Sequence, residues 1–197
     1  GAGVRHFDVA SLPELEDAKT IPDVTFHFMH PVKSRHAIRR AYQLGCRSFS
    51  LDSEDELKKI ADETGNAPDL SLWIRIAVPA MDAVIPLENK FGITGQAAVR
   101  LLVKARQLAK SLGISFHVGS QTVRPQAYAA ALAEAGRLIE RSGVALDGID
   151  VGGGFPARYS DDVPAPLSDF MRVIRDSFAK LPVADGCRFM CEPGRAL

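Results

Sequence analysis

Three consecutive glycines, Gly152 to Gly154, directly follow a short apolar run of the chain. Without Cβ atoms, such a turn lets backbone N–H groups approach a ligand and form an anion-binding concavity. The triplet alone fits a tight strand-to-loop turn equally well, since it is neither a GxGxxG sequence nor a P-loop. Arg195, which follows a second apolar run, would add a bidentate cation beside the same loop. Together these residues indicate a candidate phosphate site.

Three further side chains could complete this site. Glu192 precedes Arg195 by three residues and could meet the other end of the same ligand. A carboxylate that faces a heterocyclic nitrogen keeps it protonated, as a pyridine ring requires in order to act as an electron sink. His117 and Ser120 add a flat imidazole and a hydroxyl after a third apolar run. Each residue alone is more often an ion-pair or capping residue, so the prediction depends on their convergence.

The elements that must position these residues alternate along the whole chain. Short runs too apolar for half-solvated strands are separated by stretches of helical period, a pattern typical of a parallel sheet. The expected strands are Arg5–Ala10, Val24–Met29, Arg47–Leu51, Leu70–Val78, Ile114–Val118, Gly148–Val151 and Arg188–Cys191. The expected helices are Leu12–Lys19, Ser34–Leu44, Glu54–Glu63, Gln96–Leu112, Gln126–Ser142 and Ala165–Leu181. Gly113 is expected to end the fourth helix as a C-cap.

Seven strands separated by six helices predict an α/β fold, either a doubly wound sheet or a (β/α)8 barrel that is one strand short. In both, the chemistry lies at the carboxyl ends of the strands. Asp8 ends the first expected strand, Arg75 lies in the fourth, and Lys33 and Asp52 follow the second and third. These residues are therefore expected on the same rim as the candidate phosphate site.

The composition excludes several classes of protein. The chain has 197 residues, of which 46% are hydrophobic, and 24 basic residues balance 24 acidic ones. This is a globular composition, and it argues against disorder, nucleic-acid binding or membrane insertion. No linker or repeat divides the chain, so one domain is expected. Three scattered cysteines and no recognisable signal peptide favour a cytoplasmic protein.

Several strings of residues occur in the order seen in one enzyme family. They are Phe7-Asp8-Val9-Ala10-Ser11, Asp52-Ser53-Glu54, Lys90-Phe91-Gly92, Ser115-Phe116-His117-Val118-Gly119-Ser120, Asp150-Val151-Gly152-Gly153-Gly154-Phe155-Pro156 and Glu192-Pro193-Gly194-Arg195. Over nearly its whole length the chain resembles the fold-type III, pyridoxal-phosphate-dependent decarboxylases of basic amino acids, and most closely the ornithine decarboxylase branch.

This resemblance implies a TIM-type barrel of the alanine racemase-like kind that binds pyridoxal 5'-phosphate. It places Gly152, Gly153, Gly154, Ser120 and Arg195 on the cofactor phosphate. It assigns catalytic and cofactor-binding roles to Glu192 on the pyridine nitrogen and to His117 stacked on the ring. Asp8 and Arg75 match cofactor-binding positions near its reactive side. Lys90 matches a residue at the interface of a homodimer.

The implied reaction is decarboxylation of a basic amino acid to a diamine, with L-ornithine to putrescine preferred over lysine or diaminopimelate as substrate. In the family, the lysine that forms the Schiff base lies on a first barrel strand upstream of Phe7, and a C-terminal β domain follows Arg195. Residues 1–197 are thus expected to form one incomplete pyridoxal-phosphate-binding barrel domain, a fragment inactive alone. Lys33 follows a strand end, but His30-Pro31-Val32-Lys33 resembles a different family segment.

Two alternatives from other classes remain. One is a non-catalytic, antizyme-inhibitor-like relative that keeps the barrel for protein association, although such a protein does not need Glu192. The other is a one-domain, racemase-like barrel that binds pyridoxal phosphate. A zinc site at His27 and His30 is disfavoured, because strand alternation points these side chains to opposite faces and further ligands are missing. Cys187 and Cys191 are expected to be structural thiols.

Overall fold

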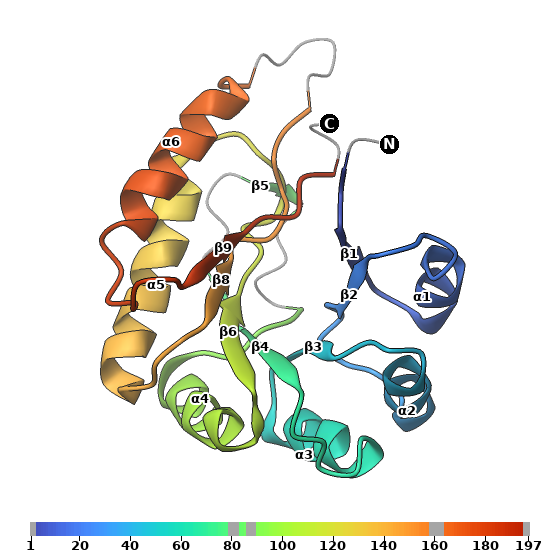
Figure 1. Ribbon diagram of the computed structural model, residues 1–197. Helices are drawn as coiled ribbons and strands as arrows, with labels where there is room; N and C mark the ends of the chain where they lie inside the picture. Colours follow the sequence, from blue (N-terminus) through green and yellow to red (C-terminus); the bar gives the residue numbers. More distant parts are fainter. Residues whose placement is uncertain (1–2, 79–82, 86–89, 158–163, 195–197) are drawn as a thin grey trace.

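The computed structural model describes residues 3–78, 83–85, 90–157 and 164–194. Seven strands of this part form one sheet of parallel strands, which curls into an open barrel (Figure 1). In sheet order they are β1 (His6–Val9), β2 (Thr25–Phe28), β3 (Ser48–Leu51), β4 (Ser71–Arg75), β6 (Ser111–Ser115), β8 (Gly148–Asp150) and β9 (Arg188–Met190). The predicted parallel α/β barrel architecture is confirmed. Its two edge strands are β1 and β9.

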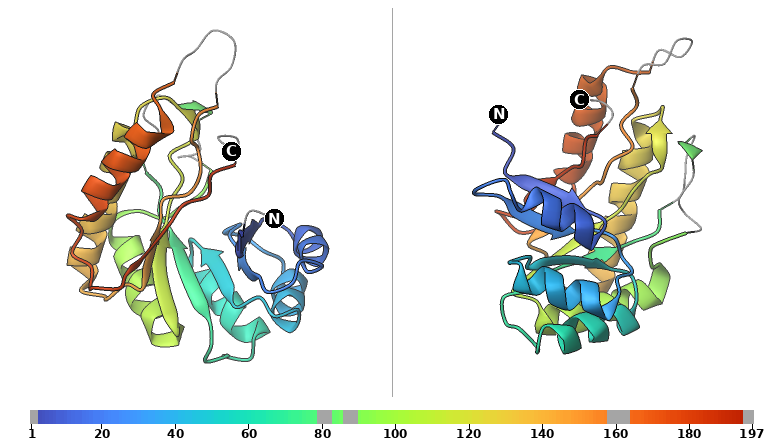
Figure 2. Two further views of the ribbon diagram at one scale, coloured as in Figure 1. Left: turned by 45° about the horizontal axis from the view of Figure 1, so that its top comes forward. Right: turned by 90° about the vertical axis from the view of Figure 1, so that its right-hand side faces the viewer.

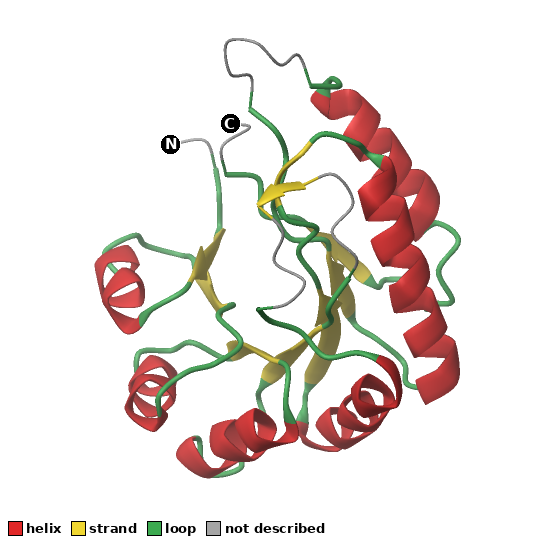
Figure 3. Cartoon of the chain, turned by 180° about the vertical axis from the view of Figure 1, so that it is seen from behind, coloured by secondary structure: helices red, strands yellow, loops and turns green. Residues whose placement is uncertain are grey.

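One helix lies in each connection between neighbouring strands of the sheet, and the helices cover its convex side (Figures 2 and 3). They are α1 (Leu12–Ala18), α2 (Arg35–Gln43), α3 (Glu54–Glu63), α4 (Gly95–Leu108), α5 (Gln126–Ser142) and α6 (Leu167–Phe178). Between helices and sheet, the registered positions Phe49, Leu72 and Leu112 are fully buried. Alternate positions face the concave side, where the polar and titratable residues gather.

The first three helices each begin with a serine N-cap. Ser11, Ser34 and Ser53 precede α1, α2 and α3, and each hydroxyl accepts a hydrogen bond from the N–H three residues later. This N-cap satisfies one of the backbone donors that a helix start leaves unpaired. Because each cap lies two to six residues after a strand, it fixes how the chain turns from the sheet edge into the helix.

Two features of the structure differ from the expectation. A short antiparallel pair, β5 (Ala83–Ile85) with β7 (Ser120–Thr122), was not predicted, because three-residue strands carry almost no periodicity. The predicted helix Gln96–Leu112 was too long. α4 ends at Leu108, Ala109 is extended with ψ of 133°, and Gly113 lies inside β6 instead of capping a helix.

Gly113 is required by the neighbouring tryptophan. Trp73 fills the concave side of the sheet and is 1% exposed, and its Nε1–H donates to the Ser48 hydroxyl over 2.9 Å. A Cβ on Gly113 would lie 2.4 Å from the Trp73 ring, and a Cβ on Gly148 would lie 2.7 Å from it. The two glycines therefore make room for one large ring inside the barrel.

Gly113→Ala is expected to lower the free energy of unfolding by about 1–3 kcal/mol, because overpacking forces a rigid buried ring to shift. Urea unfolding followed by circular dichroism measures this loss. Gly136→Ala is the matched control, since its Cβ would meet only the flexible end of Leu181 at 3.2 Å and alanine favours the α5 helix. Equal stability of the two variants would contradict the packing role of Gly113.

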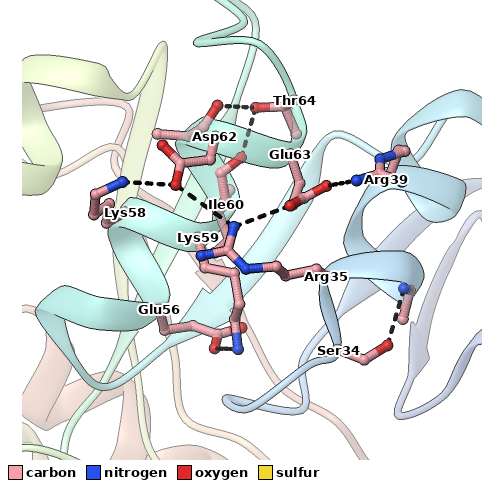
Figure 4. A network of polar contacts seen from close by, with 12 residues as sticks. Ser34, Arg35, Arg39, Glu56, Lys58, Lys59, Ile60, Asp62, Glu63 and Thr64 are labelled. Atoms are coloured by element: carbon pink, nitrogen blue, oxygen red, sulfur yellow. Dashed lines mark hydrogen bonds and ion pairs between the residues drawn. The ribbon is translucent and has the colours of Figure 1, made fainter.

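An ion-pair network joins the exposed sides of α2 and α3 (Figure 4). Glu63 pairs with Arg35 at 2.9 Å and with Arg39 at 2.5 Å, and Lys58 pairs with Asp62 at 2.7 Å. Exposed pairs of this kind contribute at most about 1 kcal/mol each. The network is thus a surface feature remote from the concave side. None of the helices in the described ranges is long and apolar enough to cross a membrane.

Candidate functional site

The loops that follow β6, β8 and β9 meet at the carboxyl edge of the sheet. The N–H of Glu192 donates to the carbonyl of Gly152 over 2.9 Å, and the N–H of Phe116 donates to the carbonyl of Asp150 over 3.1 Å. These bonds continue the parallel ladder past the strand ends. They bring the loop of His117, the glycine triplet and Glu192 side by side, as the spacing predicted.

A cavity of about 220 Å³ lies between these loops. Its wall contains the predicted site residues Asp8, His117, Ser120, Gly153, Gly154 and Glu192. Gly152 is buried next to this wall, and Arg75 acts on the cavity through its charge. Arg195 falls outside the described residues, so its predicted place beside the glycine loop rests on the sequence alone.

The glycine triplet is packed against backbone on three sides. A Cβ added to Gly152, Gly153 or Gly154 would come within 2.2–2.8 Å of a carbonyl oxygen. The blocking oxygens belong to Phe116, Glu192 and Gly119, respectively. Gly152 and Gly154 also have positive φ angles of 66° and 95°, which strain other residues. The triplet therefore exists for close backbone approach as much as for a tight turn.

The hydrogen bonds of the triplet leave two of its backbone donors unused. The N–H of Gly152 donates to a carboxylate oxygen of Asp150 over 2.9 Å, so it is already satisfied. The carbonyl of Gly153 accepts from the Tyr128 hydroxyl, and the carbonyl of Gly154 accepts from the N–H of Thr122. Within the described part of the chain, the N–H groups of Gly153 and Gly154 donate no hydrogen bond. Such free donors can bind an anion.

His117 is a neutral imidazole on the wall of this cavity. Burial, and then the charge of Arg75, lower its pKa to about 4. Its Nδ1 accepts the N–H of Gly119 over 3.0 Å, which assigns the ring proton to Nε2. The ring cannot rotate freely, and it carries no charge near pH 7. A flat, neutral ring held in this way is suited to stacking against a planar ligand.

A cluster of acids surrounds Glu192. Burial, then the charges of Asp150 and Asp8, and a hydrogen bond with Asp150 raise the pKa of Glu192 well above its ordinary value. The hydrogen bond between the two carboxyl groups raises the pKa of Glu192 and lowers that of Asp150, and the N–H of Gly152 also favours the ionised form of Asp150. Of the pair, Glu192 is therefore the group that holds a proton more readily. Arg75 is the cation that faces these acids. Glu192 can therefore donate a proton to a basic ligand atom.

Asp8 links this cluster to a second cavity of about 540 Å³ between the edge strands β1 and β9. Asp8, Glu192 and Gly194 line both cavities, and Asp150 and Cys191 line the larger one. The Asp8 side chain is open to this space but crowded by protein. Partial desolvation, followed by the charge of Asp150, raises its pKa to about 6.

The sequence did not reveal Asp150 as a site residue or the role of Asp52. Asp150 was expected only as part of a strand, although a lone acid in an apolar run is a signal that could have marked it. Asp52 was placed on the rim, but its role was not foreseen: its carboxylate accepts the N–H of Gly92 over 2.9 Å. This bond fixes the turn that carries Phe91, whose ring centroid lies 5.8 Å from the Arg75 guanidinium.

Lys33 is locked into the protein and does not face either cavity. Its ammonium pairs with Glu56 at 3.0 Å and donates to the carbonyls of Ser50 and His30, at 2.5 Å and 2.9 Å. The side chain is 1% exposed. These bonds agree with the prediction that Lys33 is not the lysine that would carry a cofactor.

The other singled-out residues also make packing contacts. His27 is buried, and its ring nitrogens lie 2.8 Å from the Ser48 hydroxyl and 2.9 Å from His6. His30 caps its own turn by accepting the N–H of Val32. Cys187 and Cys191 are free thiols. Lys90 is exposed, and its place at a dimer interface stays a prediction.

Tyr128 of α5 holds the glycine loop through a hydrogen bond to its backbone. It is fully buried, donates to the Gly153 carbonyl over 2.8 Å, and stacks on Phe155 with ring centroids 5.1 Å apart. Its phenol has a raised pKa because of burial, so it stays a donor at all ordinary pH values.

Tyr128→Phe is expected to keep the stacking and to lower the free energy of unfolding by about 1–2 kcal/mol, because the buried Gly153 carbonyl loses its donor. Chemical unfolding at pH 7 measures the change. Tyr42→Phe is the control, since the Tyr42 hydroxyl donates to Asp69 in a half-buried place where water can substitute. A loss no larger than that of the control would contradict the support role.

Comparison with known proteins places these features in one family. The sequence profile described as "Pyridoxal-dependent decarboxylase, pyridoxal binding domain" matches residues 2–197. A lysine/ornithine decarboxylase of Selenomonas ruminantium is 33% identical over 196 residues, covering 96% of this chain and 49% of the relative. A diaminopimelate decarboxylase of Pseudomonas fluorescens is 33% identical over 213 residues, covering 99% and 49%. The chain spans about half the length of these relatives.

Solved structures give the same result. The crystal structure of a mutant SrLDC in complex with PLP, the lysine decarboxylase of Selenomonas ruminantium, superposes with a TM-score of 0.85 at 33% identity. The match covers 97% of this chain and 50% of that one. Likeness of both sequence and fold over nearly the whole chain supports common descent of the barrel and not a chance resemblance of architecture.

Proposed function

The chain belongs to the pyridoxal-dependent decarboxylases through their pyridoxal-binding domain, and from this premise we propose that the complete protein decarboxylates L-ornithine to putrescine. The observation that carries the proposal is the cavity of about 220 Å³ in which Glu192, His117, Ser120 and the free N–H groups of the glycine loop meet. The family's cofactor is pyridoxal 5'-phosphate.

The residues at this cavity fit that cofactor. A phosphate needs several donors, and the N–H groups of Gly153 and Gly154 with the Ser120 hydroxyl offer them on one wall. A side chain at any of the three glycine positions would clash with a neighbouring carbonyl oxygen, so only glycine allows this loop to take its place at the cavity. Glu192 and His117, on the same cavity wall, match the needs of a pyridine ring in charge and shape. We assign Arg195 to the phosphate from the sequence.

The cofactor supplies a ring that accepts the electron pair left at the substrate α-carbon when CO2 departs. The work of this chain is to hold the ring in the right protonation state. The raised pKa of Glu192 would let it supply a proton to the ring nitrogen, and its carboxylate would then be the anionic partner of that nitrogen. Arg75 offsets the negative charge that stays on Glu192, Asp150 and Asp8.

His117 and Asp8 would play different roles toward a bound ring. Because the low pKa of His117 keeps it neutral, it could lie against the ring without competing for a proton with Glu192. Asp8 opens onto the larger cavity between β1 and β9, where a substrate amine has room to approach. A carboxyl group with a pKa of about 6 is largely ionised at pH 7 and attracts such an amine.

The choice of ornithine follows the resemblance of the segments around Asp52 and Lys33 to the ornithine branch. By name, the matched relatives act on lysine, ornithine or diaminopimelate. The described cavities do not include the distal end of a substrate site, so side-chain length is not set by them. The proposed reaction is therefore the decarboxylation of a basic amino acid, and L-ornithine is the substrate that we propose within this class.

The test uses the complete protein loaded with pyridoxal phosphate. CO2 release and amine products are measured with L-ornithine, L-lysine, L-arginine and diaminopimelate at equal concentrations. Fastest formation of putrescine is the expected result. Faster formation of cadaverine or lysine would replace ornithine but keep the reaction class. Bound cofactor without decarboxylation of any of the four would favour the non-catalytic alternative, and failure to bind the cofactor would overturn the proposal.

We also propose a cytoplasmic homodimer. The support is the three free cysteines, which suit a reducing compartment, and the exposed Lys90 at a position that the family uses for its interface. Light scattering of the complete protein tests the assembly, and a monomer at micromolar concentration would overturn it. Fractionation of the source cells tests the compartment.

A further inference from the structure

Gln121 ties the loop of the glycine triplet to the loop of Ser120. Its Nε2 donates to the carbonyl of Ala157 over 3.1 Å, and its Oε1 accepts the N–H of Ala157 over 2.9 Å. The side-chain amide thus pairs with the backbone of Ala157, 36 residues away, as a neighbouring strand would: it binds both the N–H and the carbonyl of that residue. Two bonds in this fork fix both the distance and the direction of the loop.

The backbone at Gln121 is unusual. Its φ angle is 55°, in the left-handed region that costs a residue with a side chain about 1–2 kcal/mol. The other non-glycine residues of the described chain with such angles, Asp23 and Asn66, are types that tolerate them in turns. Strain of this kind persists where the surroundings impose it, and it gathers at functional sites.

The neighbour of Gln121 binds the same loop at its other end. The N–H of Thr122 donates to the carbonyl of Gly154 over 2.9 Å, while its hydroxyl donates to the carbonyl of Gly119 over 3.0 Å. Gly154 and Ala157 are therefore both held from β7, a strand of three residues. The segment between them cannot move without breaking hydrogen bonds at one end or the other.

This clamp lies at the cavity itself. Gln121 lines it together with Ser120, Gly153 and Gly154, whose N–H and hydroxyl groups are the donors left for an anion. The amide of Gln121 is occupied by Ala157, so it does not need to touch the ligand in order to matter. What it controls is where the donors of the glycine loop point.

We propose that Gln121 is a positioning residue for the phosphate group, holding the glycine loop so that the N–H groups of Gly153 and Gly154 and the Ser120 hydroxyl converge on one anion. This inference rests on the proposed function, because it takes the phosphate of the cofactor as the ligand. It adds a residue that acts through Ala157 and the loop, without contact with the cofactor.

A purely structural tie makes a different prediction from a positioning role. Gln121→Gly removes the amide clamp and also relieves the left-handed strain, so its folded state is expected to be as stable as the wild type. Gln121→Met keeps the length of the side chain without adding a charge, but it loses both bonds to Ala157. Both variants should loosen the loop without unfolding the barrel.

The measurement compares pyridoxal 5'-phosphate with pyridoxal, which lacks the phosphate. Dissociation constants of both are measured by equilibrium dialysis on the complete protein freed of cofactor, alongside its melting temperature. For Gln121→Gly and Gln121→Met, we expect the preference for the phosphorylated compound to fall about tenfold while binding of pyridoxal stays within about twofold. Gln126→Ala, an exposed glutamine at the start of α5, is the control and should keep the full preference.

Three other outcomes would contradict either the positioning role of Gln121 or the proposed function. An unchanged preference in both Gln121 variants overturns the positioning role. Equal loss of affinity for both compounds, in step with a lowered melting temperature, shows a structural tie and overturns it as well. A wild-type protein that binds both compounds equally has no phosphate site, which overturns the proposed function itself.

Discussion

Glu192→Gln is expected to lower the rate of decarboxylation by about 10²- to 10³-fold in the complete protein. The amide has the same shape and can still donate to Asp150, so the loop geometry should persist. It cannot give up a proton and become a carboxylate, so a ring nitrogen opposite it loses its proton source and its anionic partner. Single-turnover kinetics with L-ornithine at saturating cofactor measure this loss.

The affinity for pyridoxal phosphate is the matched readout for the same variant. Because the proposed phosphate donors are the glycine loop and Ser120 and not Glu192, the dissociation constant should change by less than about fivefold. Ser120→Ala is the converse control, expected to weaken cofactor binding more than turnover at saturation. Unchanged turnover in Glu192→Gln would contradict the role of Glu192 in keeping the ring nitrogen protonated. Loss of cofactor binding alone would mean that Glu192 binds the cofactor without taking part in the reaction.

The fold could be predicted from the sequence because its signals are strong and repeated. Buried runs such as Phe49 and Leu51 on β3 alternate with amphipathic helices, and a serine cap begins three of the helices. The boundary of α4 could not be predicted, since it depends on tertiary packing: Gly113 belongs to a strand because Trp73 lies against it. Local propensity alone cannot reveal a ring from another strand.

The candidate site was predicted in outline for a similar reason. Strand ends of a parallel sheet meet on one edge, so His117 and Glu192 could be brought together by topology alone. Hydrogen-bond partners could not be foreseen, because they depend on distances between loops. That is why the hydrogen bond between Glu192 and Asp150 and the clamp from Gln121 to Ala157 emerge only from the structure.

Lys33→Ala is expected to lower the free energy of unfolding by about 3–5 kcal/mol at pH 7. The reason is that Glu56, only 3% exposed, would lose its buried counter-ion. It would keep the half-buried Lys59, at 2.5 Å (Figure 4), and the backbone N–H of residue 33. The carbonyls of Ser50 and His30 would lose their donor as well. Lys58→Ala, in the same helix as Glu56, is the control, because its pair with Asp62 is exposed and should contribute less than about 0.5 kcal/mol.

A pH series on Lys33→Met separates the charge of Lys33 from its packing. Burial lowers the pKa of Lys33 from 10.5 to about 8, although the charge of Glu56 opposes this shift. Between these two values the unfolded chain binds the proton that the folded protein has released. The contribution of Lys33 to stability therefore rises with pH across this window, by up to about 3 kcal/mol, whereas below pH 8 the ammonium is charged in both states.

The difference in unfolding free energy between wild type and Lys33→Met should accordingly grow from pH 8 to pH 10.5 and be flat from pH 6 to 7. Other groups titrate in this range, notably the buried Cys46 thiol, whose pKa burial raises to about 11. Such groups are present in both proteins, so they cancel in the difference. A difference that stays constant over the whole range would mean that the ammonium is not held in the dry environment formed by Glu56, Ser50 and His30, and the large loss predicted for Lys33→Ala would then lose its basis.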